Sequence, residues 1–511
     1  MGAVRAHERA LVTPLPMSAS TPRSTPPSVR TLGELRASGW TPRTVHQELR
    51  ANLVARLQAG EDVFPGVIGF DETVVPQIQN AILSGHSLLL LGLRGQAKTR
   101  LARSLVGLLD EWVPAIEGSE MNECPENPVT VPGRARKAAE GDALPIEWIH
   151  REDRYREKLA TPDVTVADLV GDVDPIKAAT QRLTFADPEV IHFGLLPRAN
   201  RGIFAVNELP DLQARIQVAL LNVLEEGDIQ IRGFPIRMPL DLFLVFTANP
   251  EDYTNRGSII TPLRDRIASQ VLTHYPRTLE DAKAITDQEA RGGRDAGVSV
   301  RVPEPLRDAV ELVAFQARDS EFVDQASGVS ARLSIAVLEN VLSNAERRAL
   351  LCGASSSTAR PADLFAAASA VSGKVELVYD GEREGMEAIS RMLIGRALQS
   401  AFEHHFPGAY EDGTEEEAAP YEGVLTWFRS GNRLELRDRT PDAEHLARLD
   451  TVTGLRAVVD RHAEPADDAE RAALMELVLE GLHQGSLLSR DDLDQGRVYG
   501  DMLAQMAESL R

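Results

Sequence analysis

Cysteine is scarce in this chain of 511 residues, which contains only Cys124 and Cys352. Two cysteines cannot supply a disulfide framework or a metal cage, so a secreted disulfide scaffold is excluded. Cys124 and the distant His150 do not have the spacing of zinc ligands either. No apolar run approaches the roughly twenty residues that span a bilayer, and the N-terminus has no basic and apolar signal pattern. We therefore expect a cytoplasmic protein without membrane insertion.

Basic stretches are also missing, and the formal net charge is −22. A phosphate-backbone partner would require a local basic stripe, so we expect no nucleic-acid binding. Hydrophobic residues make up 43% of the chain and charged residues 26%, which is an ordinary composition for a soluble protein. The length is sufficient for two or three domains with sizeable cores.

Short apolar runs alternate with helical patterns in the first half of the chain. Residues 1–30 are rich in Ser, Thr, Pro and Arg and predict a disordered tail. Apolar residues then recur every three or four positions over 31–58, which predicts helices. Buried strands are predicted at 88–91, 202–208 and 242–249, with helical segments between them. This alternation favours a parallel α/β sheet that binds ligands at the carboxyl ends of its strands.

The first of these strands leads into a glycine-containing loop and then a helix. Backbone N–H groups and the helix dipole at such a junction hold phosphate oxygens, Lys98 adds a positive charge, and the Thr99 hydroxyl can reach Mg²⁺. Ala97 stands where a second glycine is expected, which weakens the loop. A glycine turn before an ordinary helix remains the alternative. The residues predicted to contact nucleotide are Gly92, Leu93, Arg94, Gly95, Gln96, Ala97, Lys98, Thr99 and Arg100.

Polar residues end the other two predicted strands. Asn207 and Glu208 follow the second strand, and Asn249 follows the third. In a parallel sheet these strand ends gather at the edge where the phosphate loop lies. Taken singly, Glu208 could be a carboxylate in the first turn of a helix and Asn249 a turn cap before Pro250. Their joint order along the chain favours a phosphate site.

The segments between and after the strands carry weaker signals. Residues 113–165 are polar and predict irregular structure. Alternating apolar residues predict hairpins at 181–193 and 228–239. Apolar stripes predict a helical domain over 276–404, and the preceding residues 31–275 are expected to form the nucleotide-binding core with its N-terminal helices.

Residues 405–511 are expected to form a small C-terminal appendage without a chemical motif. An acidic stretch at 411–417 predicts a solvated linker. Residues 423–436 predict a β-hairpin, and the remainder predicts helices.

Over about residues 64–375 the chain resembles the AAA+ ATPases, and within them the ATPase subunit of magnesium chelatase and the MoxR proteins. The most specific stretch is 193–204, which is similar to the chelatase run before Walker B. Residues 247–252 resemble that family's sensor-1 segment, and residues 263–267 resemble its arginine-finger segment. The resemblance implies a P-loop core with a helical lid, in which hairpin 181–193 is the helix-2 insert and hairpin 228–239 the presensor-1 hairpin.

The resemblance also implies ATP and Mg²⁺ as cofactors. Lys98 and Thr99 would hold phosphate and Mg²⁺, and Asn207 would stand at the second metal position. Glu208 would polarise the attacking water, and Asn249 would contact the γ-phosphate as sensor 1. Phosphoryl transfer requires this combination of positioning and charge neutralisation.

Two arginines complete the implied catalytic set. Arg266 would be an arginine finger that reaches the neighbouring subunit of a homo-oligomeric ring, expected to be a hexamer. Arg332 would be sensor 2 from the lid. Either residue alone could instead form a surface salt bridge.

Two departures from the family pattern leave two functions open. Asn207 stands where an aspartate is usual and brings no charge to the metal, and Ala97 replaces a glycine. The first function is an ATP-hydrolysing ring ATPase that remodels or loads a partner protein; the second is a nucleotide-binding scaffold or switch with little hydrolysis. A von Willebrand-type metal-binding segment is absent, so such a module would belong to a separate partner chain. A bacterial enhancer-binding activator shares the fold, but its Gly-Ala-Phe-Thr-Gly-Ala loop is missing.

Overall fold

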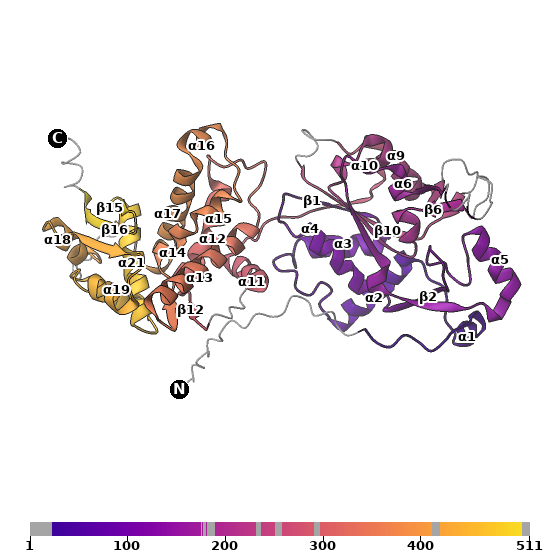
Figure 1. The fold of residues 1–511 in the computed structure, drawn as a ribbon, viewed down its shortest axis with the longest axis horizontal. Coiled ribbons are helices and arrows are strands. Elements are labelled where there is room, and N and C mark those ends of the chain that lie inside the picture. Colours follow the sequence, from indigo (N-terminus) through magenta and orange to yellow (C-terminus); the bar gives the residue numbers. More distant parts are fainter. Residues whose placement is uncertain are drawn as a thin grey trace. The chain divides into compact units, whose positions relative to one another are not determined.

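The chain folds into two compact units, Ser20–His274 and Tyr275–Arg511. Figure 1 draws the first in indigo to magenta and the second in salmon to yellow. The structure is a computed structural model that describes residues 23–174, 176, 180, 190–230, 237–250, 258–290, 297–410 and 419–502.

A five-stranded sheet forms the centre of the first unit, and all of its described neighbouring strands pair in parallel. The three strands predicted from apolar runs are adjacent in the middle of this sheet, which confirms the α/β fold class. Their carboxyl ends therefore meet at one edge. In spatial order the strands are β11 (Ser269–Leu272), β1 (Leu88–Leu91), β10 (Leu242–Ala248), β7 (Gly202–Asn207) and β4 (Tyr155–Leu159).

Side chains of the central strands alternate between two hydrophobic clusters, one on each face of the sheet. Leu88 and Leu90 pack with residues of α2, α3 and α4, whereas Leu89 packs with residues of α9 and α10. Burial on both faces explains why β1 is continuously apolar. Figure 1 shows the two sets of helices on opposite sides of the strands. These helices are α2 (Val45–Ala59), α3 (Val74–Ser84), α4 (Lys98–Ser104), α9 (Ala214–Glu225) and α10 (Thr261–Arg266).

The helices predicted over 31–58 are confirmed as α1 (Leu32–Ala37) and α2. Thr31 and Thr44 each accept a hydrogen bond from the backbone N–H of the third helical residue, and the side chain of that residue accepts one from the backbone N–H of the threonine. Such capping boxes satisfy N–H groups that the helix cannot satisfy itself. Gly60 ends α2 in the left-handed conformation that glycine adopts without steric cost.

The prediction of irregular structure over 113–165 is wrong. The segment contains β2 (Trp112–Ile116), which pairs with β3 (Ile146–His150), and α5 (Val131–Glu140). It also contains β4, the edge strand of the central sheet. The sequence of β4 is Tyr-Arg-Glu-Lys-Leu, and its stability comes from backbone pairing with β7 rather than from an apolar pattern.

Short paired strands and turns lie between the core elements. In the predicted hairpin 228–239, β8 (Asp228–Gln230) pairs antiparallel with β9 (Arg237–Pro239), and residues 231–236 lie outside the described residues. In the other predicted hairpin, residues 181–189 lie outside the described residues. Its last strand, β6 (Ile191–Phe193), pairs with the earlier β5 (Gly171–Val173). The remaining helices of this unit are α6 (Val166–Leu169) and α8 (Leu195–Arg198), with 3₁₀ turns at Leu105–Leu108, Gly141–Ala143, Arg151–Arg154 and Leu209–Asp211.

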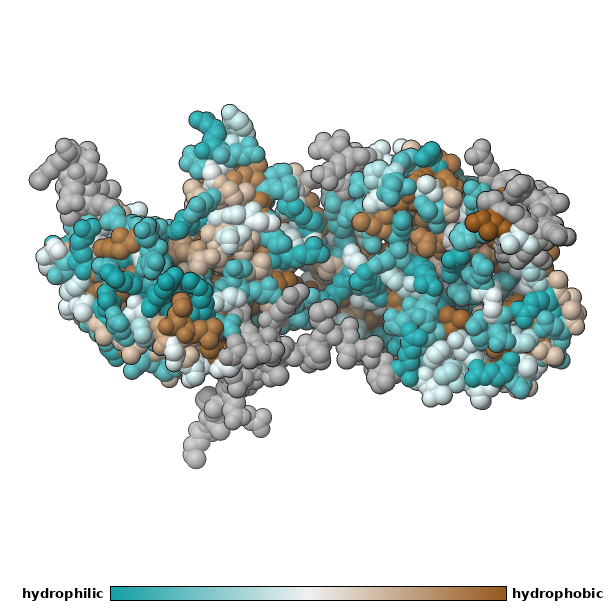
Figure 2. Space-filling model, viewed as in Figure 1, coloured by the Kyte–Doolittle hydropathy of each residue, from teal (hydrophilic) through white to brown (hydrophobic). Residues whose placement is uncertain are grey.

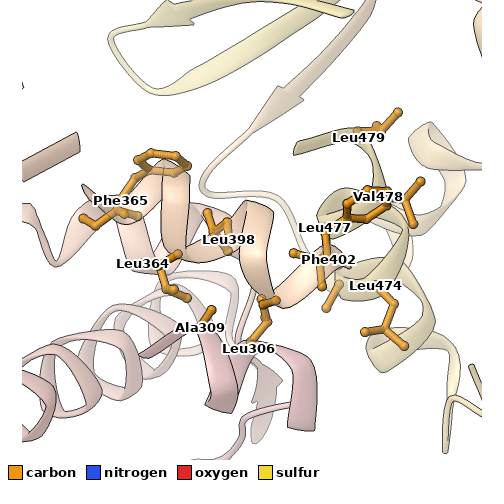
Figure 3. Packing of buried hydrophobic residues seen from close by; sticks show 14 of the residues in the cluster. Leu306, Ala309, Leu364, Phe365, Leu398, Phe402, Leu474, Leu477, Val478 and Leu479 are labelled. Atoms are coloured by element: carbon orange, nitrogen blue, oxygen red, sulfur yellow. The ribbon is translucent and has the colours of Figure 1, made fainter. Parts of the chain in front are cut away.

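The second unit is mostly helical, and one hydrophobic cluster runs through it from Leu306 to Tyr499. Figure 3 shows Leu398 and Phe402 of α17 beside residues of α12, α14 and α21. The helices predicted over 276–404 therefore share a core with the C-terminal segment. The helices are α11 (Leu279–Glu289), α12 (Glu304–Asp319), α13 (Arg332–Cys352), α14 (Pro361–Ala366), α15 (Ala368–Ser372), α16 (Tyr379–Glu384), α17 (Met386–His405), α18 (Glu422–Arg429), α19 (Asp442–Leu449), α20 (Leu455–His462) and α21 (Asp468–Gln484).

The hairpin predicted at 423–436 is wrong, because its first half is helix α18. Val424, Leu425 and Phe428 lie on one face of this helix and are buried, at the i, i+1 and i+4 spacing of a helix rather than the alternation of a strand. A hairpin does occur later in the chain, where β15 (Leu488–Leu493) pairs antiparallel with β16 (Gly496–Asp501). The strand at 434–437, β14, pairs with the other edge of β16 and completes a three-stranded sheet. The strands are β12 (Ser299–Arg301), β13 (Ser356–Thr358), β14 (Leu434–Arg437), β15 (Leu488–Leu493) and β16 (Gly496–Asp501), and the predicted linker 411–417 lies outside the described residues.

The displayed surface carries no extended apolar band. Figure 2 shows hydrophilic residues over most of it, with brown patches interspersed. None of the described helices combines the length and the apolar character that crossing a bilayer requires.

Candidate functional site

The loop after β1 is fastened to both neighbouring strands. The Gly92 N–H donates to the Ala248 carbonyl of β10 at 3.1 Å, and the Thr273 hydroxyl after β11 donates to Gln96 Oε1 at 2.8 Å. A Cβ on Gly92 would lie 2.0 Å from Thr273 Oγ1 and 2.2 Å from Gln96 Oε1. Only glycine fits there, so the first glycine of the predicted loop is a steric requirement.

Ala97 adopts the conformation that the missing glycine would adopt. Its φ is +54°, in the left-handed region, and Gly95 two residues earlier has φ +75°. The left-handed region costs a residue with a Cβ about 1–2 kcal/mol. The loop thus has a left-handed residue at position 97 despite the strain that this conformation imposes on alanine. Helix α4 begins directly after it, at Lys98. Thr99 and Arg100 are exposed at the start of this helix.

Lys98 is almost completely buried, with 7% of its surface exposed. Its ammonium donates hydrogen bonds to the carbonyl oxygens of Gly92 and Leu93, the latter at 3.1 Å, and to Asn249 Oδ1 at 2.6 Å. These three acceptors are neutral oxygens.

Asn249 connects this ammonium to Glu208. The Asn249 Nδ2 donates to Glu208 Oε2 at 3.1 Å, so one amide bridges the lysine and the carboxylate. Glu208 lies just past β7 with φ +56°, and its own N–H donates to Thr247 Oγ1 at 3.2 Å. Strained backbone at a non-glycine residue costs about 1–3 kcal/mol and is concentrated at functional sites. The three strand ends thus deliver Lys98, Glu208 and Asn249 into one connected group.

Thr247 and Glu157 lie beside this group and were not predicted from the sequence. The Thr247 hydroxyl donates to Asn207 Oδ1 at 3.4 Å. Arg103 of α4 lowers the pKa of Glu157, with smaller contributions from hydrogen bonding to Tyr155 and Asn207. Thr247 occurs two residues before Asn249 on the same strand, which was an available signal. Glu157 had none, because its strand was not predicted.

Arg266 is held by an ion pair within its own chain. Its Nε and Nη2 donate to the two carboxylate oxygens of Glu225 at 2.8 and 3.0 Å, and its Nη1 donates to the Pro262 carbonyl at 3.0 Å. No contact with Lys98 or Glu208 is recorded among the described residues. Arg266 is thus not part of the group at the strand ends of its own chain.

Arg332 lies in the second unit, at the first position of α13. Its backbone N–H donates to Ser330 Oγ at 3.2 Å, and its side chain is exposed.

The donor set at the strand ends suits a phosphate with a weakly held Mg²⁺. The ammonium of Lys98 and the N–H groups at the start of α4 can hold anionic oxygens. Thr99 and Asn207 offer neutral oxygen ligands, of the type that Mg²⁺ takes together with phosphate oxygens and water. The residues present therefore fit a metal ion bound largely through the nucleotide.

The chain is similar in sequence to subunits of magnesium chelatase, although no family model matches it. It is 28% identical over 269 residues to the chloroplastic ChlI subunit of Oryza sativa, covering 50% of this chain and 59% of that protein. It is 30% identical over 237 residues to the magnesium-chelatase 38 kDa subunit of Cereibacter sphaeroides, covering 44% and 63%. The chain thus spans about three fifths of the length of these relatives. The resemblance to the AAA+ ATPase subunit of magnesium chelatase is confirmed.

Solved structures give weaker likenesses. A model of the complex between subunits BchI and BchD of magnesium chelatase matches with a TM-score of 0.33 and 21% identity, covering 63% of this chain and 98% of the other. RuvB of Thermotoga maritima matches with a TM-score of 0.32 and 13% identity, covering 92% and 99%.

Proposed function

We propose that this protein is a Mg²⁺-dependent ring ATPase of the chelatase and MoxR type, which binds and hydrolyses ATP and remodels or loads a partner protein. The observation that carries the proposal is the hydrogen-bonded group of Lys98, Asn249 and Glu208 at the ends of three parallel strands. An ammonium, an amide and a carboxylate at that edge are the side-chain types that phosphoryl transfer requires.

Each residue of the group has a distinct role in this proposal. Lys98 exchanges neutral carbonyl and amide partners for the charged oxygens of the β- and γ-phosphates. Asn249 then contacts the γ-phosphate and keeps Glu208 oriented. Glu208 accepts a hydrogen bond from the attacking water and aligns it with phosphorus. Bound Mg²⁺, held by Thr99 and Asn207 together with phosphate oxygens, would neutralise phosphate charge.

The proposed assembly is a homo-oligomeric ring, with a hexamer as the expected size. Arg266 would contribute to the nucleotide site of the next subunit, and Arg332 would approach the nucleotide from the second unit. The partner would be a separate protein, for which a von Willebrand-type domain is one candidate. A separate partner is in keeping with the names of the similar sequences, which are described as subunits of magnesium chelatase.

A nucleotide-binding scaffold with little hydrolysis is the second candidate function. It is favoured by two observations: Ala97 is strained in the loop, and Asn207 brings no negative charge to the metal position. A lower affinity for Mg²⁺ would slow hydrolysis while nucleotide binding persists.

Steady-state phosphate release, combined with calorimetric ATP binding, separates the candidates. The parent should hydrolyse ATP, and Glu208→Gln should bind ATP with unchanged affinity but hydrolyse it at least 100-fold more slowly. Glu72→Gln, which removes an exposed carboxylate elsewhere in the same unit, is the matched control. ATP binding without turnover in the parent would favour the scaffold. No ATP binding would refute the phosphate-loop assignment.

A further inference from the structure

The ion pair between Arg266 and Glu225 holds the guanidinium of Arg266 in one orientation. Glu225 is the last residue of α9, and its two carboxylate oxygens accept from Nε and Nη2 of Arg266. Paired parallel hydrogen bonds of this kind fix the plane of the guanidinium as well as its position. The Pro262 carbonyl, four residues earlier on α10, accepts from the third nitrogen. Arg266 is therefore restrained in orientation from two sides.

The backbone that carries Arg266 is anchored independently of Glu225. Leu263 of α10 is fully buried. The buried Gln217 of α9 accepts a hydrogen bond from the Ile260 N–H at 2.9 Å and donates one to the Ser258 carbonyl at 3.1 Å. Removing the Glu225 charge should therefore leave α10 in place and release only the arginine side chain.

Arg266 keeps donors available while it is restrained. An arginine offers five N–H groups. Three of them are used, so one N–H on each terminal nitrogen has no acceptor among the described residues. The side chain of Arg266 is 32% exposed and that of Glu225 is 51% exposed. Two N–H groups on an accessible guanidinium can contact the oxygens of an incoming phosphoryl group.

Other acidic groups near Arg266 do not hold it in this way. Asp265 acts on it through charge alone, whereas the hydrogen bonds that Arg266 donates to Glu225 are the main cause that raises the pKa of Arg266. Glu226, the residue after Glu225, lies 4.0 Å from Arg237 instead.

We propose that Glu225 is a positioning residue, which orients Arg266 for the nucleotide in the neighbouring subunit. The inference rests on the proposed function, because it assigns the ion pair a task in the ring ATPase. In this proposal Glu225 acts through Arg266, to which it is hydrogen-bonded, rather than on the nucleotide itself. It acts by reducing the number of side-chain conformations that Arg266 must abandon when the neighbouring γ-phosphate arrives.

Glu225→Gln tests the proposal, with Glu226→Gln as the matched control. Misplacing a catalytic group by about 1 Å can cost roughly 100-fold in rate, so we expect kcat to fall between tenfold and 100-fold in Glu225→Gln. The ATP affinity of each subunit and the oligomeric state should stay unchanged, and Glu226→Gln should match the parent. A rate equal to or higher than that of the parent in Glu225→Gln would overturn the proposal, since Glu225 would then be neutral or restraining.

Mixing experiments identify the route of the effect. Glu225→Gln protein mixed with Glu208→Gln protein should regain activity, because some interfaces then pair an intact Glu208 with an oriented Arg266 from next door. Glu225→Gln mixed with Arg266→Ala should regain none, because both variants damage the same element. Recovery in the second mixture would overturn the positioning role.

An NMR measurement that does not require ATP hydrolysis tests the positioning by Glu225 independently of the proposed ATPase function. The Nε–H resonance of Arg266, identified by its loss in Arg266→Lys, should exchange slowly with water in the parent and broaden in Glu225→Gln. If the parent does not hydrolyse ATP, the ATPase proposal fails, and an unchanged resonance would independently refute positioning by Glu225.

Discussion

Replacing Lys98 by alanine should weaken ATP binding by about 10- to 150-fold. The Lys98 ammonium donates to the carbonyl oxygens of Gly92 and Leu93 and to Asn249 Oδ1. A bound phosphate would offer this ammonium an anionic oxygen, which is a stronger acceptor than a neutral carbonyl or amide oxygen. Such contacts contribute about 1.5–3 kcal/mol, and each 1.4 kcal/mol changes Kd about tenfold. The expected range follows from these two figures.

Calorimetric titration with ATP in the presence of Mg²⁺ measures the effect. The substitution also leaves buried acceptors without a donor, each of which can cost about 1–3 kcal/mol of stability. Thermal unfolding should therefore accompany every titration, and Lys98→Met, which keeps the side-chain volume, serves as a second variant if Lys98→Ala does not fold. Arg264→Ala removes one exposed positive charge outside the loop and should bind ATP as the parent does. A Kd within twofold of the parent value in a folded Lys98 variant would refute the phosphate-loop assignment.

Three further predictions concern the loop, the metal position and pH. Ala97→Gly relieves about 1–2 kcal/mol of left-handed strain and costs about 0.4–1 kcal/mol through the entropy of the unfolded chain. Denaturant titration should therefore show no change or a gain of up to about 1.5 kcal/mol in the free energy of unfolding, and a clear loss would contradict this balance. Asn207→Asp adds a carboxylate at the proposed metal position and should lower the Mg²⁺ concentration for half-maximal turnover; an unchanged Mg²⁺ dependence would exclude Asn207 from the metal site. Burial raises the pKa of Asp241 from 3.8 to about 6, so the folded protein binds this proton more tightly than the unfolded chain does. The free energy of unfolding of the parent, compared with that of Asp241→Asn, should therefore fall from pH 4 to pH 6 and then level off. Parallel pH profiles of the two proteins would contradict this prediction.

Much of the core fold was predictable because its strands are buried on both faces. An uninterrupted apolar run such as 88–91 is stable only in a strand or short helix that is covered on both sides. The loop was predictable because a glycine followed by a Lys98–Thr99 pair after an apolar run is a local sequence pattern. The steric requirement for Gly92 was not predictable, because Thr273 reaches the loop only through the pairing of β11 with β1.

Two elements were not predicted correctly, because their local sequences do not show the apolar pattern that identifies the buried strands. β4 is stabilised by backbone hydrogen bonds to β7, which any sequence can make, so its side chains gave no periodic signal. Helix α18 was predicted as a strand because it contains Val, Thr, Trp and Phe, residue types common in strands, and the turn-forming residues 430–432 follow it. The length and the packing partner of a short segment decide between the two, and neither is local information.

The sequence by itself determined the chemical groups available to this protein: a lysine, a threonine, an amide and a carboxylate, each following a predicted strand or loop. The tertiary structure decided which of them meet. Lys98 and Asn249 are 151 residues apart, and they come into contact only because β1 and β10 are neighbours in the sheet. The pairing of Arg266 with Glu225, 41 residues away, likewise depends on α9 packing against α10. The residue types at each position fix which chemical groups are present, whereas the contacts between distant residues arise from the burial of apolar surface over the whole unit.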